Sequence, residues 1–106
     1  MLIIGRGTTP THTFNVKSLL PDEIQTVQIT YAQYGRNLIV KTNEDGAVKI
    51  DGTTASVDLT QEETLLFCES DLAEAHIRIL TKNGKVPITD IFGVTVKRTL
   101  NDEVLT

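Results

Sequence analysis

The chain has 106 residues, of which 40% are hydrophobic, so it is long enough for one domain and too short for two. Only 5% are aromatic and Trp is absent, so we expect a core built mainly from Val, Ile and Leu. Ten Lys and Arg against fourteen Asp and Glu give a net charge of −4. This balance argues against nucleic acid as the main partner, because phosphate binding needs a positive surface.

Membrane insertion and secretion are disfavoured by the apolar pattern. The longest unbroken apolar runs, Met1–Ile4 and Leu65–Cys68, have four residues each, whereas a membrane span needs about 20. The N-terminus lacks the charged start and the long apolar segment of a signal peptide. Cys68 is the only cysteine in the sequence, which excludes an intramolecular disulfide. We therefore expect a soluble protein made in a reducing cytoplasm, with Cys68 buried as a small hydrophobe.

The first sixteen residues predict an N-terminal arm over 1–10 followed by a strand over 11–16. In the strand, His12, Phe14 and Val16 alternate with polar residues. In the arm, a glycine-rich stretch separates Leu2–Ile4 from this strand. Two interpretations of Leu2–Ile4 stay open, because an apolar terminus can carry assembly contacts or add an eighth strand to the fold.

The middle of the chain predicts four further strands, over 24–34, 37–42, 47–50 and 54–59. In the first of them Val27, Ile29 and Tyr31 share one side, which indicates a half-buried strand with Tyr31 pointing inward. The connection at 34–37 is short enough for a hairpin, and Asp51-Gly52 offers a tight turn.

After residue 59 the alternation stops and a short helix is expected. Thr60-Gln61-Glu62-Glu63 has the pattern of a capping box, so one helical turn is predicted within 60–67 as a crossover between sheets. Strands over 74–81 and 86–98 follow, joined by the hairpin signal Asn83-Gly84. Pro87 cannot donate to a strand ladder and should lie at a strand start, a bulge or an edge. Residues 101–106 are expected to form a C-terminal tail.

Seven short strands at this spacing predict an all-β, immunoglobulin-like antiparallel β-sandwich with one short helical crossover, in a single domain over 1–106. The Cys…Trp…Cys signature of antibody domains is absent from the sequence. The term immunoglobulin-like therefore describes an expected architecture and implies no antibody ancestry.

The residue types that carry catalysis are scattered. Adjacent carboxylates such as Glu44-Asp45 and Glu62-Glu63 fall in predicted turns or at the helix start, where acidic residues are commonly solvated. Cys68, His12 and His76 show neither a protease motif nor zinc-ligand spacing. We expect no catalytic, cofactor-binding or metal-binding residue, no cofactor, and no enzymatic activity.

Four segments, taken in order, resemble a known family: Gly7–Phe14, Val27–Gln33, Asp58–Thr64 and Val94–Leu105. They are similar to small virion structural proteins of phages and prophages of Firmicutes. The layout is also similar to the N-terminal immunoglobulin-like domain of phage baseplate upper proteins, which docks a receptor-binding device onto the tail. Those proteins continue into a long helical region that this sequence lacks.

The resemblance implies a non-enzymatic phage or prophage structural protein, in the tail or baseplate. Its location would be the virion, after assembly in the bacterial host cytoplasm. The implied partners are other virion proteins, without nucleic acid or membrane, and rotational symmetry favours a homo-oligomer. Because the two ends of the chain are apolar outside the predicted strands, they are the expected assembly contacts: Leu2, Ile3, Ile4, Arg6, Leu100, Val104 and Leu105.

Two alternatives to a tail subunit stay open. One is a head decoration or adaptor protein. The other is a carbohydrate- or ligand-binding module, which would require exposed aromatic side chains. Phe14, Phe67 and Phe92 suit core positions, which leaves Tyr34 as the aromatic residue expected outside the core.

Overall fold

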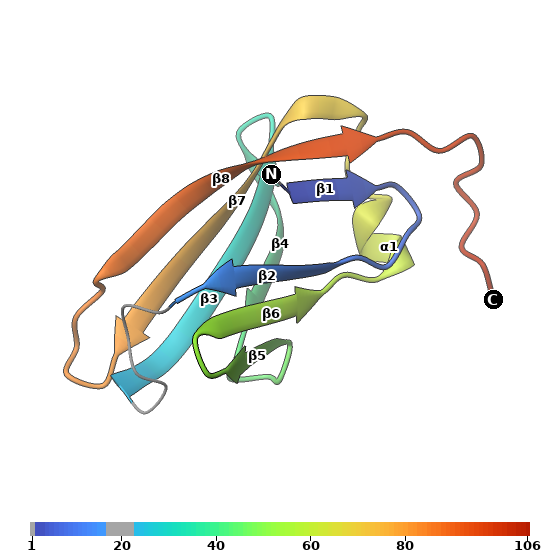
Figure 1. The fold of residues 1–106 in the computed structure, drawn as a ribbon. Coiled ribbons are helices and arrows are strands. Elements are labelled where there is room, and N and C mark those ends of the chain that lie inside the picture. Colours follow the sequence, from blue (N-terminus) through green and yellow to red (C-terminus); the bar gives the residue numbers. More distant parts are fainter. Residues whose placement is uncertain (1, 17–22) are drawn as a thin grey trace.

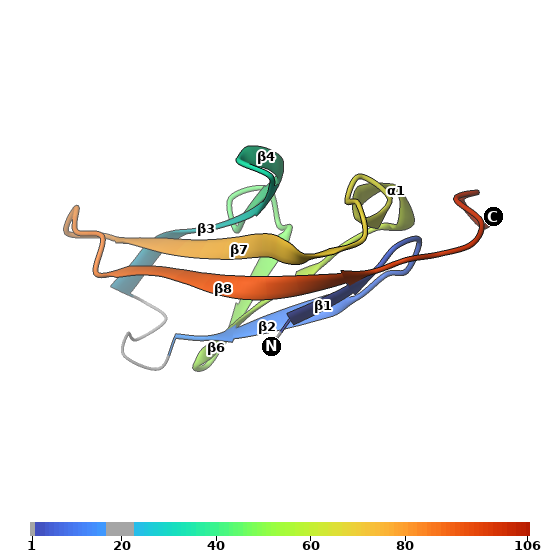
Figure 2. The same cartoon turned by 90° about the horizontal axis from the view of Figure 1, so that it is seen from above.

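The computed structural model describes residues 2–16 and 23–106, which form two β-sheets packed face to face (Figure 1). One sheet has five strands in the order β1-β8-β7-β3-β4, and the other has three in the order β2-β6-β5. Seen edge-on in Figure 2, β7 and β8 lie in one layer and β2 and β6 in the other. The elements are β1 (Leu2–Gly5), β2 (Thr11–Asn15), β3 (Ile24–Gln33), β4 (Arg36–Thr42), β5 (Val48–Asp51), β6 (Thr54–Asp58), α1 (Gln61–Thr64), β7 (Ser70–Thr81) and β8 (Ile88–Lys97).

All seven predicted strands are present, with small shifts at their ends. The largest shift is in β7, which begins at Ser70 and not at 74, because an irregular register between Ser70 and Ala73 interrupts the alternation there. β8 begins directly after Pro87, so this proline lies at a strand start as expected. The crossover helix α1 is confirmed between β6 and β7.

An eighth strand, β1, joins the five-stranded sheet at its edge. It runs parallel to β8, with Leu2 opposite Val94 and Ile4 opposite Val96. The Ile4 side chain is fully buried and Leu2 packs against the core. For Leu2–Ile4 the structure therefore supports the eighth-strand interpretation, because burial of Ile4 fixes the start of the chain to the domain.

Residues with positive φ angles lie in several of the connections between strands. Tyr34 and Gly35 connect β3 to β4 with φ angles of 53° and 75°. Two successive positive φ values are typical of a type I′ hairpin turn, which matches the twist of the strands on either side. Gly84, in the β7–β8 connection, has a φ of 82°. Glycine adopts this conformation without the steric cost that a Cβ atom would add.

The core lies between the two sheets and consists mainly of Val, Ile, Leu and Ala. Tyr31, Phe14 and Phe67 are buried in it, as expected. Phe92 departs from expectation: its side chain is 39% exposed, and one side of its ring contacts Phe14 at a centroid distance of 5.4 Å. The cause is a difference in strand length, because β7 and β8 have 12 and 10 residues whereas β2 and β6 have five each. The short sheet covers only part of the long one.

Candidate functional site

The helix α1 and the segment before β2 form a hydrogen-bonded corner at one end of the sandwich. The predicted capping box is present: the Glu63 N–H donates to Thr60 Oγ1 at 3.2 Å, and the Thr60 N–H donates to Glu63 Oε1 at 2.9 Å. The buried hydroxyl of Thr64 accepts from the Gly7 N–H at 3.0 Å and donates to the Thr8 carbonyl at 3.0 Å. These bonds attach the β1–β2 loop to the helix.

Arg6 extends this corner to the loop after α1. Its Nε donates to the Phe67 carbonyl at 2.7 Å, and its Nη2 lies 3.4 Å from the Leu65 carbonyl. The same Nη2 is 3.6 Å from Asp102 in the C-terminal tail. With its side chain only 19% exposed, Arg6 acts as an internal cross-link between three segments that are distant in sequence.

The C-terminal tail, residues 101–106, is attached to α1 through one side-chain amide. Gln61 Nε2 donates to the Leu105 carbonyl at 3.0 Å, and the Leu105 N–H donates to Gln61 Oε1 at 2.7 Å. Apolar side chains here nevertheless point to solvent: Leu105 in the tail is 78% exposed, and Leu100, directly before the tail, is 93% exposed. The backbone of the tail is therefore held while its side chains remain accessible.

The residues predicted as assembly contacts divide into two groups in the structure. Leu2 and Ile4 face the core, and Arg6 binds carbonyls of its own chain. The other residues point to solvent: Ile3 is 46% exposed, and Leu100 and Leu105 are more exposed still. Val104 is the least exposed of this group, at 37%. Assembly through these residues stays a prediction. Of the predicted assembly contacts, only the solvent-facing group is accessible to a partner in this structure.

A buried polar pair crosses the interior between the two sheets. His12 Nδ1 lies 2.6 Å from the Tyr31 hydroxyl, and His12 Nε2 lies 3.0 Å from the Ile3 carbonyl. Because a carbonyl only accepts, Nε2 carries the proton and donates, and Nδ1 accepts from the Tyr31 hydroxyl. Burial of Tyr31, and next the negative charge of Glu63, raise the pKa of its hydroxyl well above the usual value.

This pair is structural, because both side chains are nearly inaccessible, with 5% exposure for His12 and 0% for Tyr31. It joins β2 to β3 across the core and connects both to β1. The sequence contains a single cysteine, so no internal disulfide can form. The two hydrogen bonds of His12 serve instead as a non-covalent cross-link in the core. Sequence reasoning placed His12 on a strand but did not identify its partner, which is 19 residues away.

Glu63 is the second titratable group with a shifted pKa. Its carboxylate lies 2.8 Å from Lys41 Nζ on β4. Partial burial acts to raise the pKa of Glu63, but the hydrogen bonds and charge of Lys41 and the hydrogen bonds of Thr60 outweigh it. The pKa is therefore lowered below the ordinary value. The ion pair attaches the edge strand β4 to α1.

Cys68 is exposed, which corrects the prediction that it is buried. The apolar run 65–68 follows α1 as a loop, in which Phe67 occupies the core position and Leu66 is 55% exposed. The backbone of Cys68 is fixed by the buried side chain of Gln33. Gln33 Nε2 donates to the Cys68 carbonyl at 2.7 Å, and the Cys68 N–H donates to Gln33 Oε1 at 2.8 Å.

The three residues considered for nucleophilic or metal chemistry lie in different parts of the fold. His12 is inside the sandwich, Cys68 is in the loop after α1, and His76 is on the outer face of β7. Over residues 2–16 and 23–106, no group of three or more His, Cys, Asp and Glu side chains could hold a metal ion. Nor does this described part contain a helix with the length and apolarity of a membrane span.

The outer face of the five-stranded sheet is formed by β4, β3, β7 and β8 and is turned away from the three-stranded sheet. The strand registers place Val40, Thr30, His76 and Ile91 in one row across these four strands. The apolar ends of the row are exposed, with Val40 at 51% and Ile91 at 61%. We call this set the central row.

Two further rows flank the central row on the same face. Glu74 lies opposite Ala32 on one side, and Arg78 lies opposite Gln28 on the other. A shallow hollow of about 310 Å³ lies over this region; its lining residues are Gln28, Thr30, Ala32, Asn37, Glu74, His76, Arg78 and Ile91. Thr30 and Ala32 contribute small side chains to this lining. The face thus combines a polar centre with exposed apolar residues, a combination that is common in protein interfaces.

Comparison with known proteins establishes the fold class. A scan of protein-family models gives no match, and a search of curated proteins gives no significant one. Among solved structures, the NK cell receptor Nkp44 is similar, with a TM-score of 0.57 and 12% identity over 91% of this chain and 97% of that chain. The extracellular domain of mouse leukocyte-associated immunoglobulin-like receptor 1, solved as a strand-swapped dimer, matches with a TM-score of 0.47 and 13% identity over 99% of this chain and 87% of that chain.

The expected immunoglobulin-like β-sandwich is therefore confirmed. Identities at this level reflect a shared fold. Function has to be argued from the surface of this chain, because one fold hosts many unrelated functions.

Proposed function

We propose that this chain is a non-enzymatic assembly module that recognises another folded protein through the outer face of its five-stranded sheet. The observation that carries the proposal is the exposure of three large apolar side chains on that face. Val40, Leu72 and Ile91 are each more than half exposed, and Ile91 lines the polar hollow. Large exposed apolar groups that lie among polar ones are typical of protein interaction sites.

The finer form of the proposal is a structural subunit of a phage or prophage particle, in its tail or baseplate. It is supported by the resemblance of four segments to virion structural proteins. Three of these segments meet around α1: the Gly7 N–H donates to Thr64, and Gln61 binds the backbone of Leu105. Three of the four segments thus meet at one hydrogen-bonded corner, and the fourth, Val27–Gln33, lies on β3.

The direct test is to locate the chain in assembled particles. Particles induced from the host and purified on a density gradient should contain the chain in a fixed ratio to a tail protein, measured by quantitative mass spectrometry. Immunogold labelling should mark the tail or its tip. Labelling of the head would replace the tail assignment with the head decoration or adaptor alternative. Absence of the chain from purified particles would overturn the phage proposal.

The role of the outer face is tested by complementation of a deletion strain. Ile91→Glu should greatly reduce incorporation of the chain into particles, because it places a charge at an apolar contact. The matched control is Leu105→Glu, which adds the same charge to the exposed tail. Equal incorporation of both variants would contradict the assignment of the face, and loss with Leu105→Glu alone would move the contact to the tail.

The carbohydrate-binding alternative has one structural observation in its favour. Tyr34 is 62% exposed at the β3–β4 turn, where its ring could stack on a sugar. A glycan array with the purified chain decides the matter. Specific binding that is lost in Tyr34→Ala would favour this alternative over an assembly role.

A further inference from the structure

Two charged residues of β7 are arranged symmetrically about the central row of the outer face. Glu74 and Arg78 lie on the same strand, two residues to either side of His76. At about 3.4 Å per residue, each is roughly 7 Å from the row along the strand. Both side chains are exposed on the outer face, and they carry opposite charges. On β7 the face therefore presents a negative group on one side of the central row and a positive group on the other; Glu44, which accepts from Thr26 Oγ1 at 2.9 Å, lies in a hollow that Arg78 also lines.

A two-fold rotation about an axis along the central row makes such a face complementary to itself. The rotation places Glu74 of one copy opposite the partner's Arg78, and it repeats the same pair on the other side of the axis. Residues of the row meet their own counterparts, so Val40 faces the partner's Val40 and Ile91 faces the partner's Ile91. Two charge pairs and two apolar contacts thus form at once, which is the pattern of an isologous interface.

We propose that the outer face binds a second copy of this chain, with the two-fold axis along the central row. This inference rests on the proposed function and names its first partner. The argument is charge complementarity: like charges would repel on a face of one sign, whereas here Glu74 and Arg78 each meet an opposite charge. The polar hollow between the apolar contacts would hold interfacial water, as is common for faces of mixed polarity.

The charges also select this axis over the other face-to-face arrangement. An axis parallel to the strands would place Glu74 opposite the partner's Ala32 and Arg78 opposite the partner's Gln28. Both charges would then lose water without gaining a charged partner, which is unfavourable. Only the axis along the central row pairs them.

The dimer is expected to be weak. Four strands spaced about 4.8 Å apart, over about six residues of length, form a small contact area. Interfaces of that size lie at the low end of those found in specific complexes. Self-association should therefore depend on concentration, and it should be measured over a wide range that extends to several hundred micromolar.

The test is a charge exchange between two variants of the full chain. Glu74→Arg gives a face with positive charge on both sides of the row, and Arg78→Glu gives a face with negative charge on both sides. Each variant alone should lose self-association in sedimentation equilibrium. Mixed in equal amounts, they should form a heterodimer, because each positive side then meets a negative one. The double variant E74R/R78E should regain self-association.

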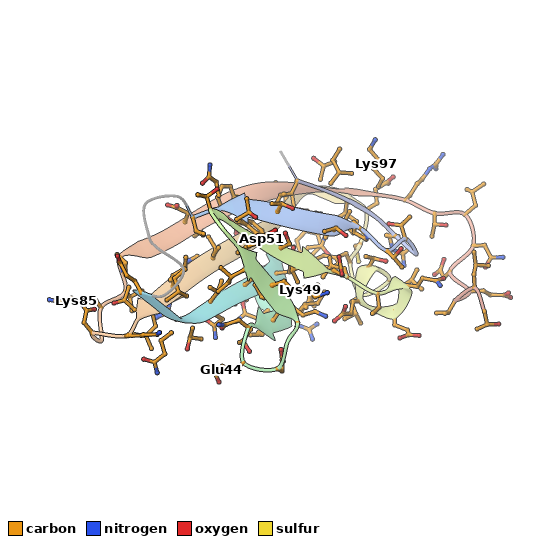
Figure 3. All side chains as sticks on the ribbon, turned by 60° about the horizontal axis from the view of Figure 1, so that its bottom comes forward. Glu44, Lys49, Asp51, Lys85 and Lys97 are labelled. Atoms are coloured by element: carbon orange, nitrogen blue, oxygen red, sulfur yellow. The ribbon has the colours of Figure 1, made fainter. Side chains whose placement is uncertain are left out.

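A charge reversal elsewhere is the matched control. Lys49→Glu changes the charge by the same amount as Arg78→Glu but lies on β5 of the other sheet, as Figure 3 shows. It should dimerise like the unmodified chain, and thermal melting should show that all variants are folded. A monomeric unmodified chain at the highest concentration, or a mixture that stays monomeric, would overturn the inference. Neither result decides the proposed function, which is tested by the presence of the chain in particles and by the incorporation of Ile91→Glu.

Discussion

The α1 corner and the outer face of the five-stranded sheet differ in how their polar groups are used. At the corner, Arg6, Gln61 and Thr64 all bind backbone groups of the same chain. On the outer face, the charged groups of Glu74 and Arg78 project into solvent on either side of the central row. The comparison teaches that charged and amide side chains in this small domain serve two purposes. Those at the corner stabilise the fold, and those on the face are available to a partner.

The same contrast applies to the apolar residues of the two regions. Ile4, beside the corner, is fully buried, whereas Ile91 on the outer face is 61% exposed. A surface rich in exposed apolar groups lowers solubility unless something covers it. The proposed self-association would bury these groups.

Truncation of the two isoleucines should give the largest difference. Ile4→Ala removes fully buried methylene groups and should lower the free energy of unfolding by about 2–5 kcal/mol. Ile91→Ala should change it by less than about 0.5 kcal/mol, because an exposed side chain loses little on truncation. Urea denaturation of both variants measures the difference. A large loss for Ile91→Ala in the monomer would mean that the outer face contributes to folding.

The two arginines offer the next largest contrast. Arg6→Ala leaves the Phe67 carbonyl without its donor and should cost about 1–3 kcal/mol of stability. Arg78→Ala, at an exposed position, should cost less than about 0.5 kcal/mol. Thermal denaturation should therefore separate the two variants by several degrees. Similar melting temperatures would show that Arg6 is not the cross-link described at the corner.

A smaller effect of opposite sign is expected at the β3–β4 turn. Tyr34 has a φ of 53°, a conformation that non-glycine residues seldom adopt. Tyr34→Asn should stabilise the domain by about 0.5–1 kcal/mol, because Asn-Gly is the preferred pair for a type I′ turn. The free energy of unfolding in urea reports the gain. A loss of stability would show that the Tyr34 ring contributes packing that its exposure does not indicate.

The smallest effect concerns the ion pair between Glu63 and Lys41. Because folding lowers the pKa of Glu63, the carboxylate contributes stability above its unfolded pKa of about 4.3, and the contribution is lost as the pH falls through the folded pKa. Glu63→Gln should therefore cost about 0.5 kcal/mol at pH 7, a value kept small by solvent screening. The difference from the unmodified chain should disappear in strong acid. A difference that does not depend on pH would assign the effect to the capping hydrogen bonds alone.

The strands were predictable because their signal is local. The alternation at Val27, Ile29 and Tyr31 and the turn at Asn83-Gly84 require no knowledge of the partner strand. The capping box at Thr60 was predictable for the same reason. Each of these features is decided within a few residues, and each is present in the structure.

The features that escaped prediction depend on residues far apart in the sequence. Burial of His12 against Tyr31, and the fixing of Cys68 by Gln33, join residues 19 and 35 positions apart. The exposure of Phe92 follows from the unequal lengths of the two sheets. The central row likewise requires the register of four strands, so the outer face could not be recognised from the order of residues alone.

Cysteine cross-linking compares the two regions most directly. In a Cys68→Ser background, Ile91→Cys places a thiol at an exposed position on the proposed two-fold axis and Leu105→Cys places one on the tail. Under mild oxidation we expect the Ile91→Cys variant to form a covalent dimer much faster than the Leu105→Cys variant, because two thiols on the axis face each other. Faster cross-linking through Leu105→Cys, or equal slow rates for both, would contradict the assignment of the outer face as the site of self-association.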